Sequence, residues 1–379
     1  MQTAGIICEY NPLHLGHQKQ MHILRAQGFG IVCLMSGNFV QRGHPAIFDK
    51  RIRAEAAVRC GADLVLELPL QYALSSAEGF AMGGVQILSR LCDTLCFGAE
   101  TADKAALMDA AQALLTPRFS DALRTHLDAG LSFPAARAAA LSGMGVDNAL
   151  VQTPNNILAV EYCKAILSQN APLDPLPILR EGGYHEKMPD AENPSATALR
   201  NLLENGENWE SFVPGSAISS FENAGIHSLK HAEKAILYRL RTMTDAEFEA
   251  LPYGSEGLWR KLMHASRQCN TLEQIIAATK SKRYTRTRID RMILCAFLGL
   301  TAEDLEAPAP YCRVLAFNDT GRNLLKQAKE SGYFVNIGTD TRHPNQEIER
   351  RATSLYGLFA DAAEAPNAEE KFRVYYSNT

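Results

Sequence analysis

The chain has 379 residues, of which 46% are hydrophobic and 21% are charged, and both fractions are ordinary for globular proteins. At ~100–200 residues per domain this length predicts two or three domains, and the composition excludes a disordered chain, a collagen-like chain and a coiled-coil rod. The formal net charge is −4 and the pI is about 6.2. Because nucleic-acid binders often have a pI above ~9, a role of that kind would depend on a local basic patch.

The first hundred residues alternate short apolar segments with segments of helical spacing. We expect strands over 4–10, 31–36, 63–69 and 93–100, with helices over 14–27, 48–61 and 76–91 between them. Strands that alternate with helices in this way indicate βαβ units and a parallel sheet. Such sheets bind ligands beyond the carboxyl ends of their strands.

The remainder of the chain is mainly helical. Residues 102–168 are predicted to be mostly helical and residues 230–306 almost entirely helical. Shorter elements are expected as strand 175–181, helix 195–206, strand 311–319, helix 320–332, strand 333–338 and helix 346–361. A Ser-rich segment with Trp209 and Pro214 suggests a boundary near 206–228. We therefore expect an α/β protein with an N-terminal Rossmann-like parallel-sheet domain over 1–206 and a mainly helical C-terminal region over 207–379.

Nine cysteines are scattered through apolar segments, without a Cys-x-x-Cys pair. This distribution is typical of reduced core thiols and does not suggest a zinc site or a disulfide framework. The N-terminus has neither a basic nor an apolar signal-peptide region, and no apolar run approaches the ~18 residues of a membrane span. We expect a cytoplasmic protein with no membrane contact, and the sequence carries no signal of oligomeric state.

The strongest functional signal lies between the first predicted strand and the first predicted helix. His14-x-Gly16-His17, preceded by Asn11-Pro12, fits the HxGH pattern of HIGH-type nucleotidyltransferases and class I aminoacyl-tRNA synthetases. Gly16 would let a phosphate or adenine approach the backbone, beside the free N–H groups of a helix N-terminus. As catalytic residues, His14 and His17 would donate hydrogen bonds to the transferring phosphoryl group. The alternative is a helix start with two solvent-exposed histidines.

A second signal is the segment Ser195-Ala196-Thr197-Ala198-Leu199-Arg200, which resembles the second phosphate signature of the same superfamily. Ser195 or Thr197 could cap a helix whose free N–H groups face the β and γ phosphates. Arg200 would add a fixed cation. The alternative is an ordinary helix cap followed by a surface arginine, and the HxGH motif favours the phosphate interpretation.

Longer segments are similar to the bacterial tRNA(Met) cytidine acetate ligase family, in order and across nearly the whole chain. That family has a HIGH-type nucleotidyltransferase domain followed by a helical part. The resemblance implies an ATP-dependent ligase that activates acetate as acetyladenylate and acetylates N4 of the wobble cytidine (C34) of elongator tRNA(Met), forming N4-acetylcytidine. The similar segments are 5–18, 35–69, 95–100, 153–162, 178–187, 195–200, 282–300 and 313–325.

The resemblance also implies an ATP site. Gly98 would leave room for the adenosine, Asn155 would bond a ribose or base edge, and Arg180 would pair with a phosphate. Without the resemblance, these three residues would be interpreted as a turn, a helix cap and a surface side chain. Leu13 replaces the Phe that is more usual in the family. The implied ATP-binding residues are Ile7, Cys8, Glu9, Tyr10, Asn11, Pro12, Leu13, His14, Leu15, Gly16, His17, Gln18, Lys19, Gln20, Gly98, Asn155, Asn156, Arg180, Ser195, Thr197 and Arg200.

The implied chemistry needs little from the protein beyond binding. Acetate is ionised at pH 7 and needs no general base to attack the α-phosphate, so positioning and charge stabilisation would suffice. No cysteine has a convincing base partner. Mg²⁺ would be carried by the triphosphate, since no carboxylate cluster is evident and only Glu9 and Asp49 lie near the motif.

A local basic segment offers a surface for tRNA. Residues 260–300 contain nine Lys or Arg and two Asp or Glu, which is a phosphate-neutralising pattern, and Tyr284 could stack on a base. The alternative is a solvated helix start. A second candidate is the polar segment 35–45, which we expect to form a loop beyond the second strand, with Asn38, Gln41, Arg42 and His44. The expected tRNA-binding residues are Lys280, Lys282, Arg283, Arg286, Arg288 and Arg291.

Two other functions remain open from the residues alone. A small-molecule adenylyltransferase would use the same nucleotide site but would leave the basic segment unexplained. An RNA-binding protein with a vestigial site would not need the intact His14, Gly16, His17 and Arg200.

Overall fold

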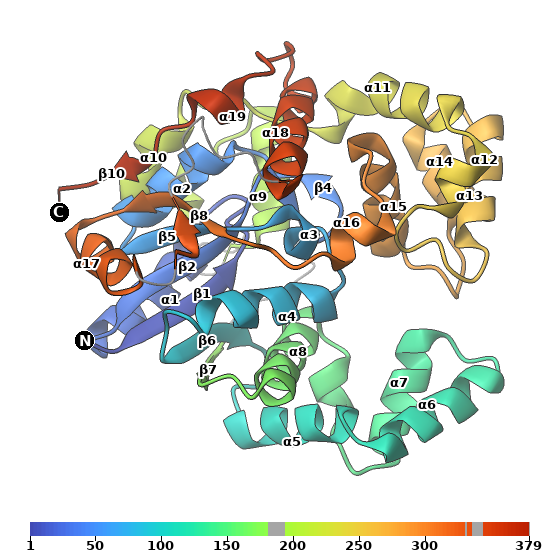
Figure 1. Cartoon of the computed structure of the whole chain (residues 1–379), viewed down its shortest axis with the longest axis horizontal. Helices are drawn as coiled ribbons and strands as arrows, with labels where there is room; N and C mark the ends of the chain where they lie inside the picture. Colours follow the sequence, from blue (N-terminus) through green and yellow to red (C-terminus); the bar gives the residue numbers. More distant parts are fainter. Residues whose placement is uncertain (181–193, 330–331, 336–343, 379) are drawn as a thin grey trace.

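A computed structural model describes residues 1–180, 194–329, 332–335 and 344–378, organised around an eight-stranded sheet (Figure 1). The strand order is β10-β8-β5-β2-β1-β6-β7, and β9 pairs with β8. The strands are β1 Thr3–Cys8, β2 Gly30–Ser36, β5 Leu64–Leu68, β6 Thr94–Ala99, β7 Asp174–Leu179, β8 Cys312–Phe317, β9 Phe334–Val335 and β10 Tyr375–Tyr376.

The sheet is mostly parallel, as the βαβ pattern predicts. The pairs β1–β2, β2–β5, β1–β6 and β6–β7 are parallel, whereas β8 runs antiparallel to β5. After β1 the chain adds β2 and β5 on one side and later adds β6 and β7 on the other. The carboxyl ends of β1 and β6 therefore flank a topological switch point, where open α/β sheets bind ligands.

Helices cover both faces of the sheet because successive strand residues point to opposite sides. Ile7 and Leu34 pack in the core that includes α4, α5 and α8, while Ile6 and Cys33 pack in the core that includes α1, α2, α9 and α10. These helices are α1 Leu15–Ala26, α2 Lys50–Arg59, α4 Ala77–Leu88, α5 Lys104–Leu114, α8 Pro154–Gln169, α9 Ala196–Asn205 and α10 Gly215–Phe221.

A helical cluster with its own core stands beside the sheet, at the right of Figure 1. Its core also takes Phe39 and Leu70 from the N-terminal part of the chain and Tyr356 from α18. The cluster comprises α11 Leu229–Thr242, α12 Asp245–Glu249, α13 Leu258–Gln268, α14 Leu272–Thr279, α15 Arg286–Leu298 and α16 Ala302–Glu306. The other helices are α3 Leu70–Ala73, α6 Pro117–Asp128, α7 Phe133–Ser142, α17 Asp319–Gln327, α18 Pro344–Tyr356 and α19 Ala368–Lys371.

The C-terminal part of the chain returns to the sheet after the helical cluster. β8 and β10 lie in the same sheet as β1, so this sheet takes strands from both sides of residue 206. The division into 1–206 and 207–379 stays a prediction, and the helical part of the second region is concentrated in α11–α16.

Buried ion pairs connect the C-terminal segment to the sheet. Lys50 Nζ on α2 lies 2.8 Å from carboxylate oxygens of both Glu67 on β5 and Glu369 on α19. Arg313 on β8 pairs with Glu369 and contacts the Phe372 ring, with its guanidinium carbon 4.1 Å from the ring centroid. Burial of this network makes its partners mutually dependent, because an unpaired charge there would be costly.

Several elements differ from the sequence-based expectations. The segment 35–45, taken as a loop, contains a short hairpin with β3 Phe39–Val40 and β4 His44–Pro45. The helix α3 and the strand β10 were not expected. Parts of four expected segments lie outside the described residues. These parts are residue 181 of strand 175–181, residues 330–331 of helix 320–332, residues 336–338 of strand 333–338 and residues 181–187 of the similar segment 178–187.

The cysteines match their expected place in the core. All nine are free thiols, and every one except Cys269 is buried. In the part of the chain that the structure describes, no helix combines the length and apolar character of a membrane span.

Candidate functional site

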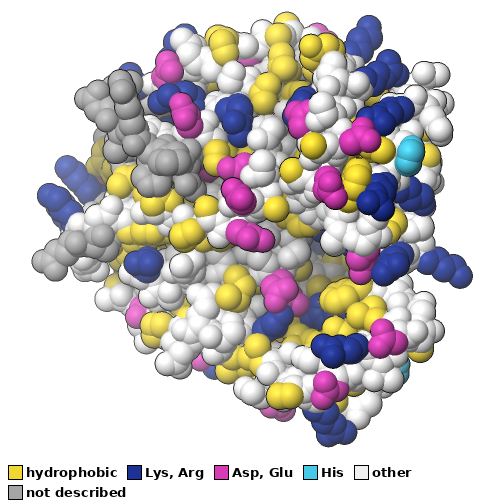
Figure 2. All heavy atoms as spheres, turned by 45° about the vertical axis from the view of Figure 1, so that its right-hand side comes forward, with side chains coloured by type: hydrophobic (Ala, Val, Ile, Leu, Met, Phe, Trp, Pro, Cys, Tyr) yellow, Lys and Arg dark blue, Asp and Glu magenta, His cyan; other side chains and the backbone are white. Residues whose placement is uncertain are grey.

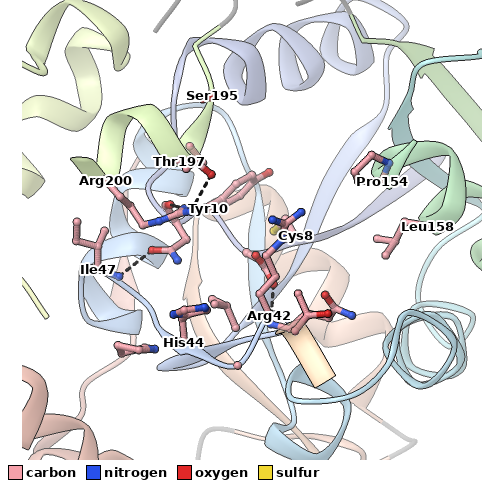
Figure 3. Close-up of a pocket in the computed structure, with 18 of the residues that line it drawn as sticks. Cys8, Tyr10, Arg42, His44, Ile47, Pro154, Leu158, Ser195, Thr197 and Arg200 are labelled. Atoms are coloured by element: carbon pink, nitrogen blue, oxygen red, sulfur yellow. Dashed lines mark hydrogen bonds between the residues drawn. The ribbon is translucent and has the colours of Figure 1, made fainter. Parts of the chain in front are cut away.

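A cavity of about 1150 Å³ opens at the carboxyl ends of β1 and β6 (Figure 3). One wall comes from the β1–α1 segment, the end of β6, the N-terminal half of α8, the end of β7 and the start of α9. The opposite wall comes from the β3–β4 hairpin and from α11, α14 and α15. The cavity therefore lies where the sheet topology predicts a ligand, and it faces the helical cluster.

The β1–α1 connection turns sharply at the edge of this cavity. Tyr10 has a positive φ of 44°, and the Asn11–Pro12 peptide is cis. The Asn11 side chain accepts a hydrogen bond from the Ile47 backbone N–H at 2.7 Å, which ties this connection to the segment after the hairpin. The result is a fixed entry into α1, whose first residue is Leu15.

The two motif histidines form a capping box at the start of α1. His14 Nδ1 accepts a hydrogen bond from the Gly16 N–H, and His17 Nδ1 accepts one from the His14 N–H, each at 3.2 Å. Since both Nδ1 atoms accept, this geometry assigns the ring proton of each neutral histidine to Nε2. His14 Nε2 is buried and has no hydrogen-bond partner among the described residues.

Burial keeps both imidazoles neutral. It lowers the pKa of His14 well below its ordinary value, and the charges of His17, Arg180 and Arg200 add to the effect. Burial also lowers the pKa of His17 to about 3, with a contribution from Arg180. The pair therefore offers Nε2–H donors rather than cations at neutral pH, which suits hydrogen bonding to a phosphoryl oxygen.

The glycines of the site have different roles. A Cβ on Gly16 would lie 3.1 Å from His14 Cε1, so Gly16 makes room for the His14 ring as well as for a ligand. A Cβ on Gly98 would have Arg180 Cβ, 3.9 Å away, as its nearest neighbour. Because Gly98 lines the cavity, a larger side chain there would extend into the space that a ligand would occupy.

The start of α9 brings the second phosphate signature to the same cavity. Ser195 Oγ accepts a hydrogen bond from the Ala198 N–H and caps the helix. Arg200 donates to the Asn11 carbonyl at 2.7 Å and to Thr197 Oγ1 at 3.0 Å. The guanidinium is thus held against the HxGH connection, as Figure 3 shows.

A carboxylate that the sequence analysis did not select organises the start of α8. Glu100 accepts hydrogen bonds from Thr153 Oγ1, Asn155 Nδ2 and the Asn156 N–H at 2.7–2.8 Å. Asn155 Oδ1 in turn accepts from Arg180 at 3.3 Å. The position of Glu100 directly after β6 could have revealed this role, since polar groups at strand ends commonly build sites.

The structure brings most of the expected ATP-site residues to this cavity. Asn156 is an exception, because its side chain is buried in hydrogen bonds with Thr101 and Ala149. The expected residues that line the cavity are Ile7, Cys8, Glu9, Tyr10, Asn11, His14, Gly16, His17, Lys19, Gln20, Gly98, Asn155, Arg180, Ser195, Thr197 and Arg200. The expected residues outside its lining are Pro12, Leu13, Leu15, Gln18 and Asn156.

The basic segment is divided between the cavity and the outer surface. Arg286 and Arg291 line the cavity, whereas Lys280, Lys282, Arg283 and Arg288 do not. Acidic side chains accompany several of these cations, and Figure 2 shows Lys and Arg interspersed with Asp and Glu on this side of the molecule.

Specific ion pairs account for this mixture. Arg286 forms a bidentate pair with Glu273, with N–O distances of 2.8 and 2.7 Å. Arg283 and Arg288 lie 3.4 and 3.6 Å from the same carboxylate oxygen of Glu256. These neighbours reduce the positive charge that the local count of residues predicts.

Tyr284 does not have the role expected for it. Its ring is buried, with 9% relative exposure, and its hydroxyl donates to the Glu256 carbonyl at 2.6 Å. Stacking on an RNA base, as the sequence suggested, is therefore wrong for this residue.

The described residues contain no group of three or more His, Cys, Asp or Glu side chains arranged to hold a metal ion. The two carboxylates closest to the motif in sequence have structural partners. Glu9 accepts from the Gln41 N–H at 2.8 Å, and Asp49 caps α2 by accepting from the Arg51 N–H at 2.7 Å.

Known proteins are similar to this chain over most of their length. A family model described as HIGH Nucleotidyl Transferase matches residues 1–371. A tRNA(Met) cytidine acetate ligase of Clostridium novyi is 38% identical over 354 residues, covering 87% of this chain and 88% of the relative. A protein of the same name from Clostridium perfringens is 34% identical over 387 residues, covering 94% and 95%.

Solved structures lead to the same group. The apo crystal structure of Thermotoga maritima TmcAL superposes with a TM-score of 0.92 at 28% identity, and the form bound with alpha-thio ATP superposes with 0.89 at the same identity. Both comparisons cover 100% of each chain. The chain therefore belongs to the HIGH nucleotidyl transferase family and, within it, to the tRNA(Met) cytidine acetate ligase family.

Proposed function

We propose that this protein activates acetate with ATP and transfers the acetyl group to N4 of the wobble cytidine of elongator tRNA(Met). The observation that carries the proposal is the cavity at the carboxyl ends of β1 and β6. It gathers His14, His17, Arg180 and Arg200 from three separate segments of the chain. The names of the relatives favour this ligase over an adenylyltransferase for small molecules.

In the first step an acetate oxygen attacks the α-phosphorus of ATP, and pyrophosphate leaves. The attacking group is already an anion at neutral pH, so the site needs donors and cations rather than a general base. The neutral Nε2–H groups of His14 and His17 would donate to phosphoryl oxygens, and Arg180 and Arg200 would balance the charge of the triphosphate.

Mg²⁺ would enter with the triphosphate rather than reside in the protein. The Glu9 and Asp49 carboxylates are engaged by backbone N–H groups, which leaves phosphate oxygens and water as its main ligands. The tRNA would approach from the side of α14 and α15. A cytoplasmic location suits an enzyme with this substrate.

The test supplies ATP, radiolabelled acetate and total tRNA, followed by nucleoside analysis. We expect labelled N4-acetylcytidine from elongator tRNA(Met), with AMP and pyrophosphate released only when acetate is present. A transcript in which the wobble cytidine is replaced by uridine serves as the control and should stay unlabelled. Unlabelled tRNA in the complete reaction, or a stable adenylylated small molecule, would contradict the proposal.

A further inference from the structure

The second step of the proposed reaction has a requirement that the HxGH motif does not meet. The cytidine amine attacks the acetyl carbon, the new N–C bond forms, and the C–O bond to adenylate breaks with its electron pair leaving on AMP. The amine must then give up one proton to become an amide nitrogen. A side chain with an open acceptor atom beside the site would assist this transfer.

The histidines of the cavity differ in what their ring nitrogens contact. In His14 and His17 the Nδ1 atom accepts a hydrogen bond from a backbone N–H group. Each ring can therefore offer a ligand only its Nε2–H donor. His227 is 3% exposed and contacts the Gly225 carbonyl and the Glu364 carboxylate. Among the described histidines that line the cavity, this leaves His44 as the candidate acceptor.

His44 has the surroundings of a general base. Its side chain is 36% exposed, and its Nε2 lies 3.5 Å from Oδ2 of Asp290, whose side chain is 5% exposed. A carboxylate at Nε2 favours the tautomer with its proton there and leaves the Nδ1 lone pair for a substrate. Figure 3 places His44 in the same cavity as Arg200 and Tyr10.

The hairpin that carries His44 is fixed on two sides. Gln41 donates its N–H to Glu9 at 2.8 Å and accepts at its carbonyl from Arg291 on α15 at 3.2 Å. Gly43, with φ +82°, packs so closely on α15 that a Cβ would lie 2.4 Å from the Arg291 nitrogen. His44 is thereby held between the nucleotide motif and the helical cluster.

Several charged side chains lie near this pair, and one of them, Arg291, interacts electrostatically with Asp290. Asp290 also lies 3.5 Å from Arg286 Nε, and Arg286 is bound to Glu273. On the hairpin side the charged neighbours in the cavity wall are Arg42 and Glu9.

The adjoining part of the cavity suits a nucleobase. The same cavity that His44 and Asp290 line also has apolar lining from Ile47, Leu272, Ile276 and Ile293. The cavity of about 1150 Å³ exceeds the ~300–1000 Å³ of a usual site for one small ligand. Enzymes that modify a base commonly move it out of its stack into such a pocket, and carboxylates can accept from a cytosine amine.

We propose that His44 Nδ1 takes the proton of the cytidine amine during acyl transfer, that Asp290 positions His44, and that the target base occupies the cavity between the β3–β4 hairpin and α14 and α15. This inference rests on the proposed ligase function and adds the residues of its second step. The proton then passes from His44 to solvent, and AMP leaves with the electron pair of the broken bond.

The test separates the two half-reactions of the full-length protein. Acetate-dependent exchange of pyrophosphate into ATP reports acetyladenylate formation, and single-turnover transfer of labelled acetyl to elongator tRNA(Met) reports the second step. In His44→Ala we expect exchange at the wild-type rate and transfer slowed by ~10²–10⁴-fold, with partial recovery on adding imidazole. His22→Ala, on the exposed face of α1, should match wild type in both assays.

Asp290→Asn adds a readout that a structural role would not move. The readout is the dependence of the single-turnover transfer rate on tRNA concentration, which separates the rate of the chemical step from tRNA binding. In Asp290→Asn the single-turnover transfer rate at saturating tRNA should fall, because His44 is no longer held in place, whereas the tRNA concentration that gives the half-maximal rate should stay at the wild-type value.

The outcomes discriminate between the proposals. Equal loss of exchange and transfer in His44→Ala, or no loss in either, would overturn the assignment of His44 while leaving the ligase function intact. A wild-type transfer rate at saturating tRNA in Asp290→Asn would overturn the positioning role. Wild-type protein without acetate-dependent exchange would overturn the proposed function and this inference together.

Discussion

The imidazole rings of His14 and His17 stack with their centroids 3.7 Å apart and their planes inclined by 28°. Two charged rings would repel each other at this separation, whereas two neutral rings pack well. The lowered pKa values of both histidines agree with this arrangement. The HxGH motif is therefore a pair of preorganised neutral donors, and its spacing serves the helix cap as much as the ligand.

Replacing His14 with Ala should slow adenylate formation by ~10²–10³-fold, the usual effect of removing one donor from a developing charge. The protein should remain folded, although loss of the helix cap costs ~1 kcal/mol. Acetate-dependent exchange of pyrophosphate into ATP measures the effect, with His22→Ala as the matched control. Exchange at the wild-type rate in His14→Ala would remove this histidine from the catalytic assignment.

The neutral histidines also predict how stability depends on pH. The pKa of His17 is lowered to about 3 by burial, while the unfolded chain has the ordinary value near ~6.5. Between these values the unfolded state binds more protons, so the free energy of unfolding falls as the pH decreases through this window.

Replacing His17 with Gln should weaken this dependence. Between pH 7.5 and 5.5 we expect the variant to lose less unfolding free energy than wild type, by on the order of 1 kcal/mol. Urea denaturation at the two pH values measures the difference. His22→Gln should keep the wild-type dependence, and a His17→Gln variant that does the same would contradict the prediction.

Local patterns predicted much of the fold. Apolar periodicity located β1, β2, β5 and β6 and the helices α1, α2 and α4, because burial of both faces of a parallel sheet determines the pattern directly. The antiparallel neighbour β8 was placed as a strand but not in this sheet. It pairs Leu64 with Phe317, and no local signal connects residues so far apart in the chain.

In the site, too, residues within a local motif were predictable, whereas contacts between distant parts of the chain were not. His14, Gly16 and Arg200 could be recognised from motifs, whereas the partner of Arg200 is the Asn11 carbonyl, a backbone atom that carries no side-chain signature. The position of the Glu256 carboxylate beside Arg283 likewise depends on how the segment between α14 and α15 packs against the loop before α13. Counting charges in a segment therefore overestimated its positive field.

Replacing Gly98 with Val should weaken ATP binding at least ~10-fold with little change in stability. The nearest atom to a Cβ at this position is 3.9 Å away, so a side chain would fill ligand space instead of disturbing the protein. Calorimetric titration with ATP measures the affinity. Gly215→Val, at a position where a Cβ meets no atom within 4 Å, is the matched control. Unchanged ATP affinity in Gly98→Val would place the adenosine elsewhere.

The surface lysines of the basic segment provide the clearest test of tRNA binding. Lys280 and Lys282 are exposed, and they lie outside the cavity. Arg286, by contrast, is bound to Glu273 and near Asp290, so reversing its charge would disturb the site itself. The double variant Lys280→Glu/Lys282→Glu therefore tests binding of the tRNA phosphates without changing a residue that lines the cavity.

We expect this double variant to bind tRNA more weakly, and the slope of log affinity against log salt to decrease by roughly one for each phosphate that the protein no longer neutralises. ATP affinity and acetate-dependent pyrophosphate exchange should stay at wild-type values, because neither lysine lines the cavity. Lys326→Glu/Lys329→Glu, at α17 on the other side of the molecule in Figure 1, matches the change in net charge. If both double variants weaken tRNA binding equally, the effect comes from net charge, and α14–α15 is not the tRNA surface.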